Sequence, residues 1–371
     1  MSRFSIRKPK IDIVLAMITI ALVAFGLIML SSVSAVNSFE HFGYNNFYLY
    51  RQMGFFAVGM VGWIFFQNLN YHYWKKIAKP FFLISLLLTF LVLVPGIGFN
   101  YNGASRWLNL GFFLFQPSEL LKLALVVYLA SWFDNMRSEI GSFRKVFVPF
   151  VILIGFIAAI ILKQPDMGTF LVTGSVAVAI YFVAGARVIH IGFLLGGGIM
   201  GIIALIKAAP YRMARLLVFL DPEKDPLGAG FHINQALIAV GSGGWWGRGF
   251  GKSGQKYTGY IPEAPGDSIF AIIAEELGFV KLVFAPILLF IIFAWRGFHI
   301  ARFAPDFFGK LLAFGLTSWI IFQAVLNIST MVALVPLTGV PLPFISYGGS
   351  AMITNLCAVG ILLNISKNSN K

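Results

Sequence analysis

Long uncharged apolar stretches constrain the fold of this 371-residue chain more than any other feature of its sequence. Residues 17–30, 81–94, 146–162 and 282–295 contain no charged side chain. Each stretch fills all or most of the roughly 17–25 residues needed to cross a bilayer. Charged residues make up only 11% of the chain, against about 25% in soluble domains. Polar surface is too scarce to cover a soluble particle, so the sequence predicts a polytopic membrane protein.

Ten apolar segments can be drawn along the chain, and lipid requires each of them to satisfy its own backbone hydrogen bonds, which favours helices. We therefore expect one all-α membrane domain over residues 1–371, with about ten transmembrane helices. Residues 207–267, between the seventh and eighth helices, are rich in Gly, Pro, charge and aromatics, which predicts a long, ordered extracellular loop. The predicted helices are centred near Ala21, Met60, Leu87, Val126, Leu153, Val176, Gly198, Leu277, Trp319 and Asn355.

The formal net charge of +14 fits a membrane topology, because cytoplasmic loops collect Lys and Arg. Basic clusters lie at the N-terminus and after the second, fourth and eighth predicted helices, which places both termini in the cytoplasm. Nothing in the sequence resembles a folded nucleic-acid-binding module. The first 35 residues imitate a signal peptide, but their apolar run exceeds the about 7–15 residues of a signal core. We expect this run to remain as the first span.

Acidic side chains at the predicted outer face are the candidates for catalysis. Asp267 begins the eighth predicted helix, where Asp is favoured as an N-cap. Partial burial at that point would also raise its pKa and suit a general base, and the two roles are compatible. Glu263 is a second candidate for the base. Glu275 and Glu276 follow about two turns into the helix, where we expect interhelical polar contacts.

A charged pair lies at the start of the fourth predicted helix. Glu119 and Lys122 are three residues apart and therefore share one helix face. Charged groups inside a membrane are costly and mark functional sites by default. One interpretation is a self-neutralising pair that stabilises the helix. The other is a pair that lines a polar cavity open to the outside.

Basic, aromatic and glycine residues gather in and beside the long loop. Arg and Lys suit phosphate groups, although attraction to anionic lipid headgroups also explains them. Trp107, Trp245 and Trp246 fit either an interfacial belt or the wall of a sugar or lipid site. The glycines between residues 241 and 254 allow the backbone to approach a ligand closely. Histidines are scattered without metal-ligand spacing. The basic residues are Arg106, Arg212, Arg215, Arg248, Lys252 and Lys256.

Several of these segments, in their order and spacing, resemble the SEDS family, which comprises the FtsW and RodA proteins of bacterial cell-wall synthesis. The resemblance covers nearly the whole chain. It rests on the motifs GASRWL (103–108), FQPSELLK (115–122), QPDMG (164–168), FLDP (219–222), SGG (242–244), QK (255–256), YIPEA (260–264) and LPFISYGGS (342–350).

The resemblance implies an inverting peptidoglycan glycosyltransferase that polymerises lipid II at the outer face of the bacterial cytoplasmic membrane. The family's essential acid falls on Asp267, which would be the general base. Its other functional positions fall on Trp107, Glu119, Lys122 and Asp166. We expect the substrate's diphosphate to be held by cations, and a divalent metal (Mg²⁺ or Mn²⁺) could share that work. The candidate cationic side chains are Arg212, Arg215 and Lys256, and Arg106 is a further candidate for substrate binding.

One departure from the family pattern lies beside the expected base. The family commonly has His-Thr-Asp-Phe, whereas this chain has Pro265-Gly-Asp-Ser, which keeps the carboxylate and lacks the histidine. The motifs favour the division type (FtsW-like) slightly over the elongation type (RodA-like). Family members work with a class B penicillin-binding protein, a transpeptidase, which we expect as partner alongside membrane lipids. The alternatives are a lipid II flippase, although the paired broken helices of transporters are not evident, and a non-catalytic scaffold for the transpeptidase.

Overall fold

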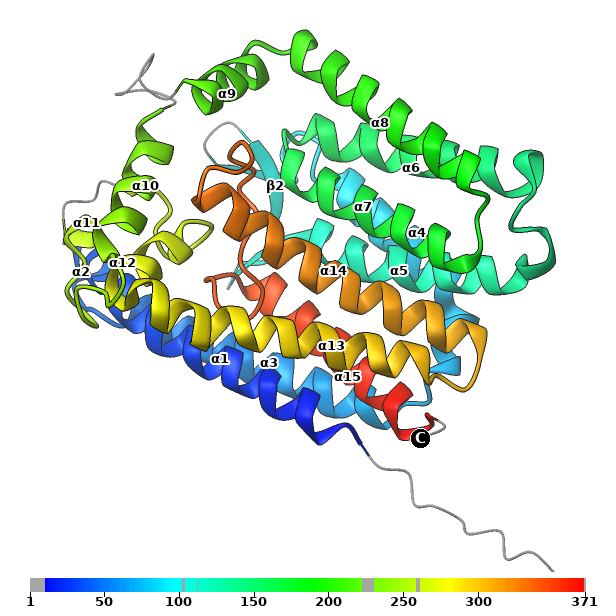
Figure 1. Ribbon diagram of the computed structural model, residues 1–371, viewed down its shortest axis with the longest axis horizontal. Helices are drawn as coiled ribbons and strands as arrows, with labels where there is room; N and C mark the ends of the chain where they lie inside the picture. Colours follow the sequence, from blue (N-terminus) through cyan, green and yellow to red (C-terminus); the bar gives the residue numbers. More distant parts are fainter. Residues whose placement is uncertain (1–10, 102–103, 112, 222–229, 258–260, 370–371) are drawn as a thin grey trace, which may run out of the picture.

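The computed structural model describes residues 11–101, 104–111, 113–221, 230–257 and 261–369, and it is a bundle of long helices with one small sheet (Figure 1). The basic N-terminal residues and parts of the long loop lie outside the described residues. The long helices are α1 (Ile13–Val33), α3 (Phe47–Asn68), α4 (His72–Leu91), α5 (Pro117–Asn135), α6 (Val148–Lys163), α7 (Met167–Ala184), α8 (Val188–Ala208), α13 (Leu288–Arg302), α14 (Phe307–Met331) and α15 (Gly349–Lys367).

The apolar stretches form helices as expected. Within the described residues, eight helices are long and apolar enough to cross a membrane. Helices α4 and α5 also have the length of a span, but lysines at the start of α4 and three charged residues in α5 make them more polar. The prediction of an all-α polytopic membrane protein is confirmed. The side of the membrane on which each loop lies stays a prediction.

The eighth predicted helix is wrong in its position, because two helices stand where one was expected. The short α12 (Ile269–Leu282) precedes the span, which runs from Phe284 to Arg302 through a π-helical turn into α13. Gly278 interrupts α12 with φ 73° and ψ 173°. At this break the Phe279 amide donates a hydrogen bond to the Gly244 carbonyl oxygen at 2.9 Å. The Val280 amide donates to that of Trp245 at 3.1 Å. The helix therefore breaks where a distant segment pairs with its backbone.

The segment that reaches α12 follows α10 (Phe231–Gly243). The described part of the long loop also contains α9 (Pro210–Leu220) and α11 (Gly254–Tyr257). A Cβ added to Gly243 would lie 2.1 Å from the Ala274 carbonyl oxygen, and one on Gly247 would lie 2.3 Å from that of Glu276. These two glycines allow close approach to protein backbone. Packing against α12 therefore accounts for both glycines without the ligand that the sequence analysis predicted there.

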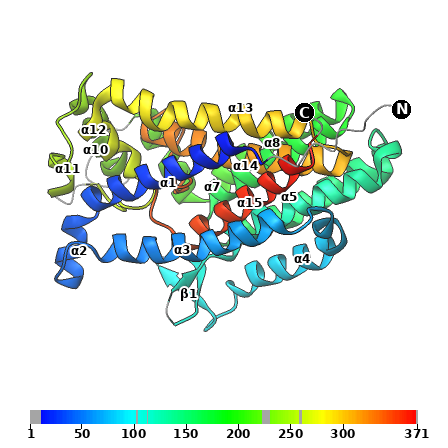
Figure 2. The ribbon, with the colours of Figure 1, turned by 90° about the horizontal axis from the view of Figure 1, so that it is seen from below.

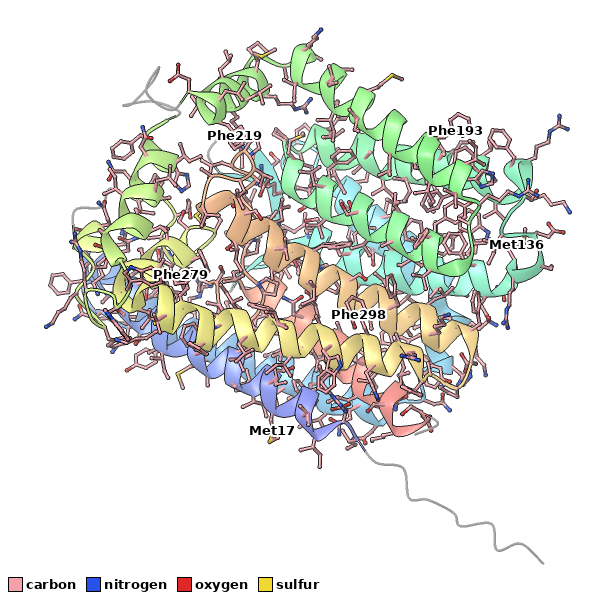
Figure 3. All side chains as sticks on the ribbon, in the orientation of Figure 1. Met17, Met136, Phe193, Phe219, Phe279 and Phe298 are labelled. Carbon is pink, nitrogen blue, oxygen red and sulfur yellow. The ribbon has the colours of Figure 1, made fainter. Side chains whose placement is uncertain are left out.

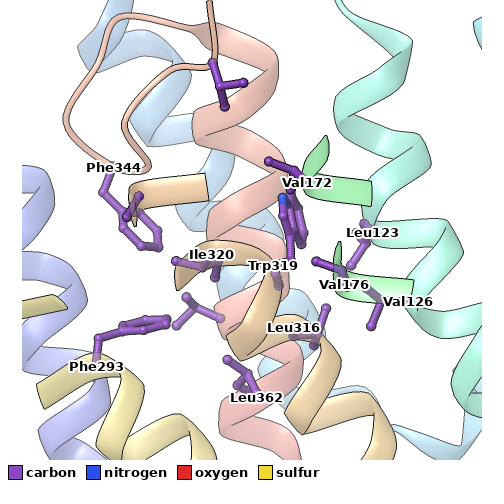
Figure 4. Packing of buried hydrophobic residues seen from close by; sticks show 14 of the residues in the cluster. Leu123, Val126, Val172, Val176, Phe293, Leu316, Trp319, Ile320, Phe344 and Leu362 are labelled. Carbon is purple, nitrogen blue, oxygen red and sulfur yellow. The ribbon is translucent and has the colours of Figure 1, made fainter. Parts of the chain in front are cut away.

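The centre of the bundle is built from α5, α7, α14 and α15. Trp319 on α14 is fully buried between Val172 and Val176 of α7, and Phe293 and Phe344 pack on the other side of α14 (Figure 4). In lipid, helices associate through close packing and small residues rather than through burial from water. Gly360 of α15 illustrates this, since a Cβ there would lie 2.6 Å from the Trp63 carbonyl oxygen on α3.

Helix α8 lies at the periphery, along the upper edge of Figure 1 beside α6 and α7. Only 6% of its most apolar window is buried inside the protein. Phe193 on α8 and Met17 on α1 point outward (Figure 3) and are 60% and 57% exposed. These apolar faces are suited to contact with lipid chains, whereas α14 and α15 are shielded from lipid by the helices around them.

A three-stranded antiparallel sheet departs from the all-helical expectation. It consists of β1 (Gly98–Tyr101), β2 (Ala104–Asn109) and β3 (Leu114–Phe115), and β2 is the central strand. Trp107 of β2 pairs with Phe99 of β1. Figure 2 shows the sheet at the edge of the bundle, below α3 and to the left of α4. Its significance is local, because β2 carries Arg106 and Trp107.

The two ends of the described chain lie at the same end of the bundle (Figures 1 and 2). The Asp12 amide donates to the Ser366 hydroxyl at 3.1 Å, and the Arg296 guanidinium pairs with the Asp12 carboxylate. These contacts tie α1, α13 and α15 together. An even number of spans is consistent with this arrangement, and the cytoplasmic location of both termini stays a prediction.

The contact between α10 and α12 can be tested with two alanines in one helix. Gly243→Ala should destabilise the fold by about 1–3 kcal/mol, because its methyl group collides with the α12 backbone. Gly241→Ala is the control, since a Cβ there meets nothing within 4 Å. We expect a lower thermal unfolding midpoint in detergent for Gly243→Ala alone. Equal midpoints for the two variants would contradict the close approach.

Candidate active site

Asp267 lies in the segment before α12, outside the candidate spans, and its backbone is held from two sides. The buried Asn327 side chain on α14 donates 2.7 Å hydrogen bonds to the carbonyl oxygens of Asp267 and Val340. The Tyr347 amide donates to the Pro265 carbonyl oxygen at 2.8 Å. The 261–268 segment is thereby fixed against residues 338–347. Sequence reasoning missed Asn327, although an amide inside an apolar helix was a visible signal.

The Asp267 carboxylate has Ser268, Gly339 and Arg106 as neighbours. Its Oδ1 accepts a hydrogen bond from Ser268 Oγ at 3.2 Å. A Cβ added to Gly339 would lie 3.5 Å from its Oδ2 and 4.0 Å from an Arg106 guanidinium nitrogen. Helix α12 begins two residues later, and the described residues show no hydrogen bond from its first turn to Asp267. The carboxylate is therefore not the N-cap that the sequence suggested.

The pKa of Asp267 is raised from 3.8 to about 6. Burial is the largest cause, because it disfavours the charged carboxylate. The hydrogen bonds from Ser268 and from the residue's own amide lower the pKa, as do the positive charges of Arg215 and Arg106, but burial outweighs them. A carboxylate with a pKa near 6 is ionised at neutral pH and remains basic enough to accept a proton during a reaction.

Two of the predicted cations act on Asp267: Arg106 lies on the far side of Gly339 from it, and the charge of Arg215 lowers its pKa. Arg106 on β2 donates to the carbonyl oxygens of Gln164, at 3.2 Å, and Pro165. Arg215 on α9 is exposed and donates to the Leu337 carbonyl oxygen at 3.2 Å. A shallow hollow next to Arg215, between α9 and α10, is lined by Val218, Phe219, Ile233 and Leu337. Figure 3 shows Phe219 on the side of α9 that faces the bundle.

Two other predicted cations form contacts elsewhere. Arg212 donates to the carbonyl oxygens of Leu205 and Leu162, at 3.1 and 3.4 Å, and so joins the ends of α8 and α6. Lys256 is 5% exposed, and its Nζ donates to Glu276 Oε1 at 2.9 Å and to Ser32 Oγ at 2.8 Å. Lys256 thus joins α1 to α12. A phosphate-binding role for these two side chains stays a prediction.

The deeper glutamates make the interhelical contacts that we expected. Glu276 is fully buried and accepts from Ser32 Oγ at 2.8 and 3.0 Å in addition to Lys256. Glu275 accepts from Ser253 Oγ at 2.5 Å and from the Gly254 amide at 3.1 Å. Both carboxylates therefore hold the 253–256 segment against α12.

The Glu119–Lys122 pair is confirmed as an ion pair, with Lys122 Nζ 2.8 Å from Glu119 Oε1. Both residues are almost fully buried, and Lys122 Nζ also donates to Gln323 Oε1 at 2.6 Å. Gln323 in turn donates to the Pro341 carbonyl oxygen at 3.0 Å. The pair neutralises itself and is linked through Gln323 to the segment that flanks Asp267. This geometry favours a supporting role over the wall of an open cavity.

Asp166 and Trp107 are placed at the margin of the site. Asp166 caps α7, because its Oδ1 accepts from the Thr169 amide at 3.0 Å and its Oδ2 from Thr169 Oγ1 at 2.8 Å. The adjoining Gly168 packs against Thr338, whose carbonyl oxygen would lie 2.6 Å from an added Cβ. Trp107 is partly buried on β2, next to Arg106. Asp166 therefore fixes the start of α7, where Gly168 packs against Thr338.

Comparisons with known proteins agree on one family. The FtsW/RodA/SpoVE family profile, described as cell cycle protein, matches residues 13–371. Stage V sporulation protein E of Bacillus subtilis is 42% identical over 98% of this chain and 99% of its own length. A probable peptidoglycan glycosyltransferase FtsW of Trichlorobacter lovleyi is 40% identical over 97% of this chain and 95% of its own.

Solved structures show the same fold. A chain from a peptidoglycan synthase complex, described as coordinating polymerization and crosslinking, superposes with a TM-score of 0.79 at 29% identity, covering 96% of this chain and 97% of that one. The rod shape determining protein RodA of Thermus thermophilus gives a TM-score of 0.69 at 29% identity, covering 97% and 98%.

The buried Lys256–Glu276 pair separates a structural role from substrate binding. Lys256→Met leaves a buried carboxylate unpaired and should destabilise the fold by roughly 3–5 kcal/mol, seen as a lower unfolding midpoint. The double variant Lys256→Met with Glu276→Gln should recover most of that loss. A Lys256→Met protein of unchanged stability that binds substrate poorly would instead support the phosphate-binding prediction.

Proposed function

This chain belongs to the FtsW/RodA/SpoVE family of cell cycle proteins, and on that premise we propose that it is a peptidoglycan glycosyltransferase that polymerises lipid II. The observation that carries the proposal is Asp267, a partly buried carboxylate with a raised pKa, set beside two arginines. A multi-pass membrane protein of this family would work at the outer face of the bacterial cytoplasmic membrane, where the lipid-linked substrate is polymerised.

Asp267 is the general base of the proposed reaction. It removes the proton from the 4-hydroxyl of the acceptor sugar while that oxygen bonds to the anomeric carbon of the donor. The bond between that carbon and the undecaprenyl diphosphate breaks, and the diphosphate leaves with the electron pair. The proton stays on Asp267 until solvent takes it. One base and direct displacement invert the anomeric configuration, so no covalent sugar–enzyme intermediate is needed.

The leaving diphosphate needs positive charge, and Arg215 and Arg106 supply it beside the base. Arg215 borders the apolar hollow between α9 and α10, so a charged group and an apolar surface meet at one place. That combination suits a diphosphate attached to a polyprenyl chain. The other predicted substrate-binding residues would influence the substrate indirectly, by positioning the segments around the site. They are Trp107, Glu119, Lys122 and Asp166.

A divalent cation would add Lewis-acid neutralisation of the diphosphate. Mg²⁺ in phosphate sites commonly keeps several waters and binds substrate phosphates together with few protein ligands. Among the described residues, no three Asp, Glu, His or Cys side chains converge on one point. A divalent cation here would therefore be held mainly by the diphosphate oxygens of the substrate, and Asp267 would remain the base.

We propose a class B penicillin-binding protein, a transpeptidase, as the partner. The synthase complex that this chain resembles is described as coupling polymerization to crosslinking, which supports such a pairing. An identity of 40% with an FtsW relative, against 29% with RodA, supports the division type over the elongation type.

The first test is polymerisation of labelled lipid II by the purified protein with its transpeptidase. Asp267→Asn and Asp267→Ala should each lower the rate by at least about 100-fold, because a general base is lost. Glu263→Gln, an exposed neighbour, is the matched control and should retain activity. Full activity in the Asp267 variants would move the base to Glu263. Lipid II transport across liposomes without polymer would favour a flippase.

The pH dependence gives a second test. Polymerisation should rise with pH as Asp267 loses its proton near pH 6, and fall about tenfold per unit below that. The raised pKa also destabilises the folded protein as pH rises from about 4 to about 6. Asp267→Asn should therefore unfold at a higher temperature than the wild type at pH 8, and the difference should shrink at pH 5. A rate independent of pH between 5 and 8 would contradict this assignment.

A further inference from the structure

A histidine from a different element reaches the candidate base through one hydroxyl. His232 lies in the first turn of α10, and its Nε2 is 2.6 Å from Ser268 Oγ. The Ser268 side chain is fully buried, and its Oγ lies 3.2 Å from Asp267 Oδ1 and 2.9 Å from the Pro262 carbonyl oxygen. Nothing in the sequence linked His232 with Asp267, because 34 residues lie between them.

The hydrogen atoms at Ser268 constrain how these groups interact. A hydroxyl carries one hydrogen and can accept through its lone pairs. The Pro262 carbonyl and an ionised Asp267 can only accept, so the Ser268 hydrogen goes to one of these two oxygens when His232 Nε2 carries the imidazole hydrogen. The pKa of His232 is lowered to about 4, chiefly by burial, so the imidazole is neutral at working pH. A neutral imidazole has one N–H, and the tautomer that carries it at Nε2 can donate to Ser268 Oγ.

We propose that His232 is a positioning residue for Asp267, which it orients and tunes by donating to the Ser268 hydroxyl that donates to the carboxylate. This inference rests on the proposed function, because it assigns Asp267 the role of base. When Asp267 is ionised, the Ser268 hydrogen points at Oδ1 and stabilises the negative charge. When Asp267 takes up a proton, the same hydrogen turns to the Pro262 carbonyl. The hydroxyl thus follows the protonation state of the base.

The charged neighbours act on both ends of this chain of hydrogen bonds. Arg215 on α9 lowers the pKa of both Asp267 and His232, and Arg106 on β2 lowers that of Asp267. Glu263, in the segment that precedes Asp267, raises the pKa of His232. Burial outweighs these charges at both groups. The position of α10 is fixed independently, because Gly243 rests on the α12 backbone.

The test compares variants that remove the donor with one that keeps it. His232→Phe fills the space without a donor, and Ser268→Ala removes the hydroxyl. Each should raise the pKa of Asp267, which moves the acidic limb of the pH profile of kcat/KM upward by about one pH unit. The double variant should show no further shift, because both changes break one chain. His232→Gln retains an N–H near the Nε2 position and should restore most of the wild-type profile.

An infrared titration separates this inference from the proposed function. The C=O band of protonated Asp267 can be identified by its loss in Asp267→Asn and followed against pH without any turnover. An upward shift of its midpoint in His232→Phe, with recovery in His232→Gln, supports the inference even if the protein polymerises nothing. Failure of wild-type polymerisation would overturn only the proposed function. An unchanged midpoint in folded His232→Phe would overturn the role of His232.

Discussion

Three buried side-chain amides hold the irregular backbone on which the site depends. Residues 336–348 run without helix between α14 and α15, where backbone groups have little access to water. Buried backbone groups of this kind need protein partners for their hydrogen bonds. Asn327 and Gln323 donate to the carbonyl oxygens of Val340 and Pro341. Gln52 donates to the Ser346 carbonyl oxygen and accepts from the Gly348 amide. The same Asn327 also holds Asp267, so the support of the loop and the position of the base are one network.

This network explains why the candidate site is assembled from so many elements. The carboxylate comes from the segment before α12, one arginine from β2 and the other from α9, and His232 from α10. None of these elements is a long span. The spans act through their polar positions, as Lys122 does when it reaches the loop through Gln323. Burial raises the pKa of Asp267, and no negatively charged neighbour is among the causes of the shift. Desolvation alone therefore keeps this carboxylate basic.

The sequence predicted the features that depend on local composition. Apolar runs identified the spans, and an acidic residue after Pro265-Gly266 identified Asp267. Features that depend on distant pairing were not predictable in the same way. The break at Gly278 exists because residues 244–249 pair with α12. Lys256 was predicted to bind phosphate because the sequence does not reveal its partners. Ser32 and Glu276 both lie far from it along the chain. His232 had no visible purpose until α10 was placed against Ser268.

The Lys256–Glu276 pair also bears on how this chain can change in evolution. Each charge is buried against the other, with Ser32 of α1 completing the contact. A single substitution would strand one charge away from water, whereas an exchange at both positions would not. Selection should therefore treat positions 256 and 276 as one unit, and substitutions accepted there should arise in pairs. The attachment of the long loop to α1 and α12 is thus inherited as a matched set of side chains.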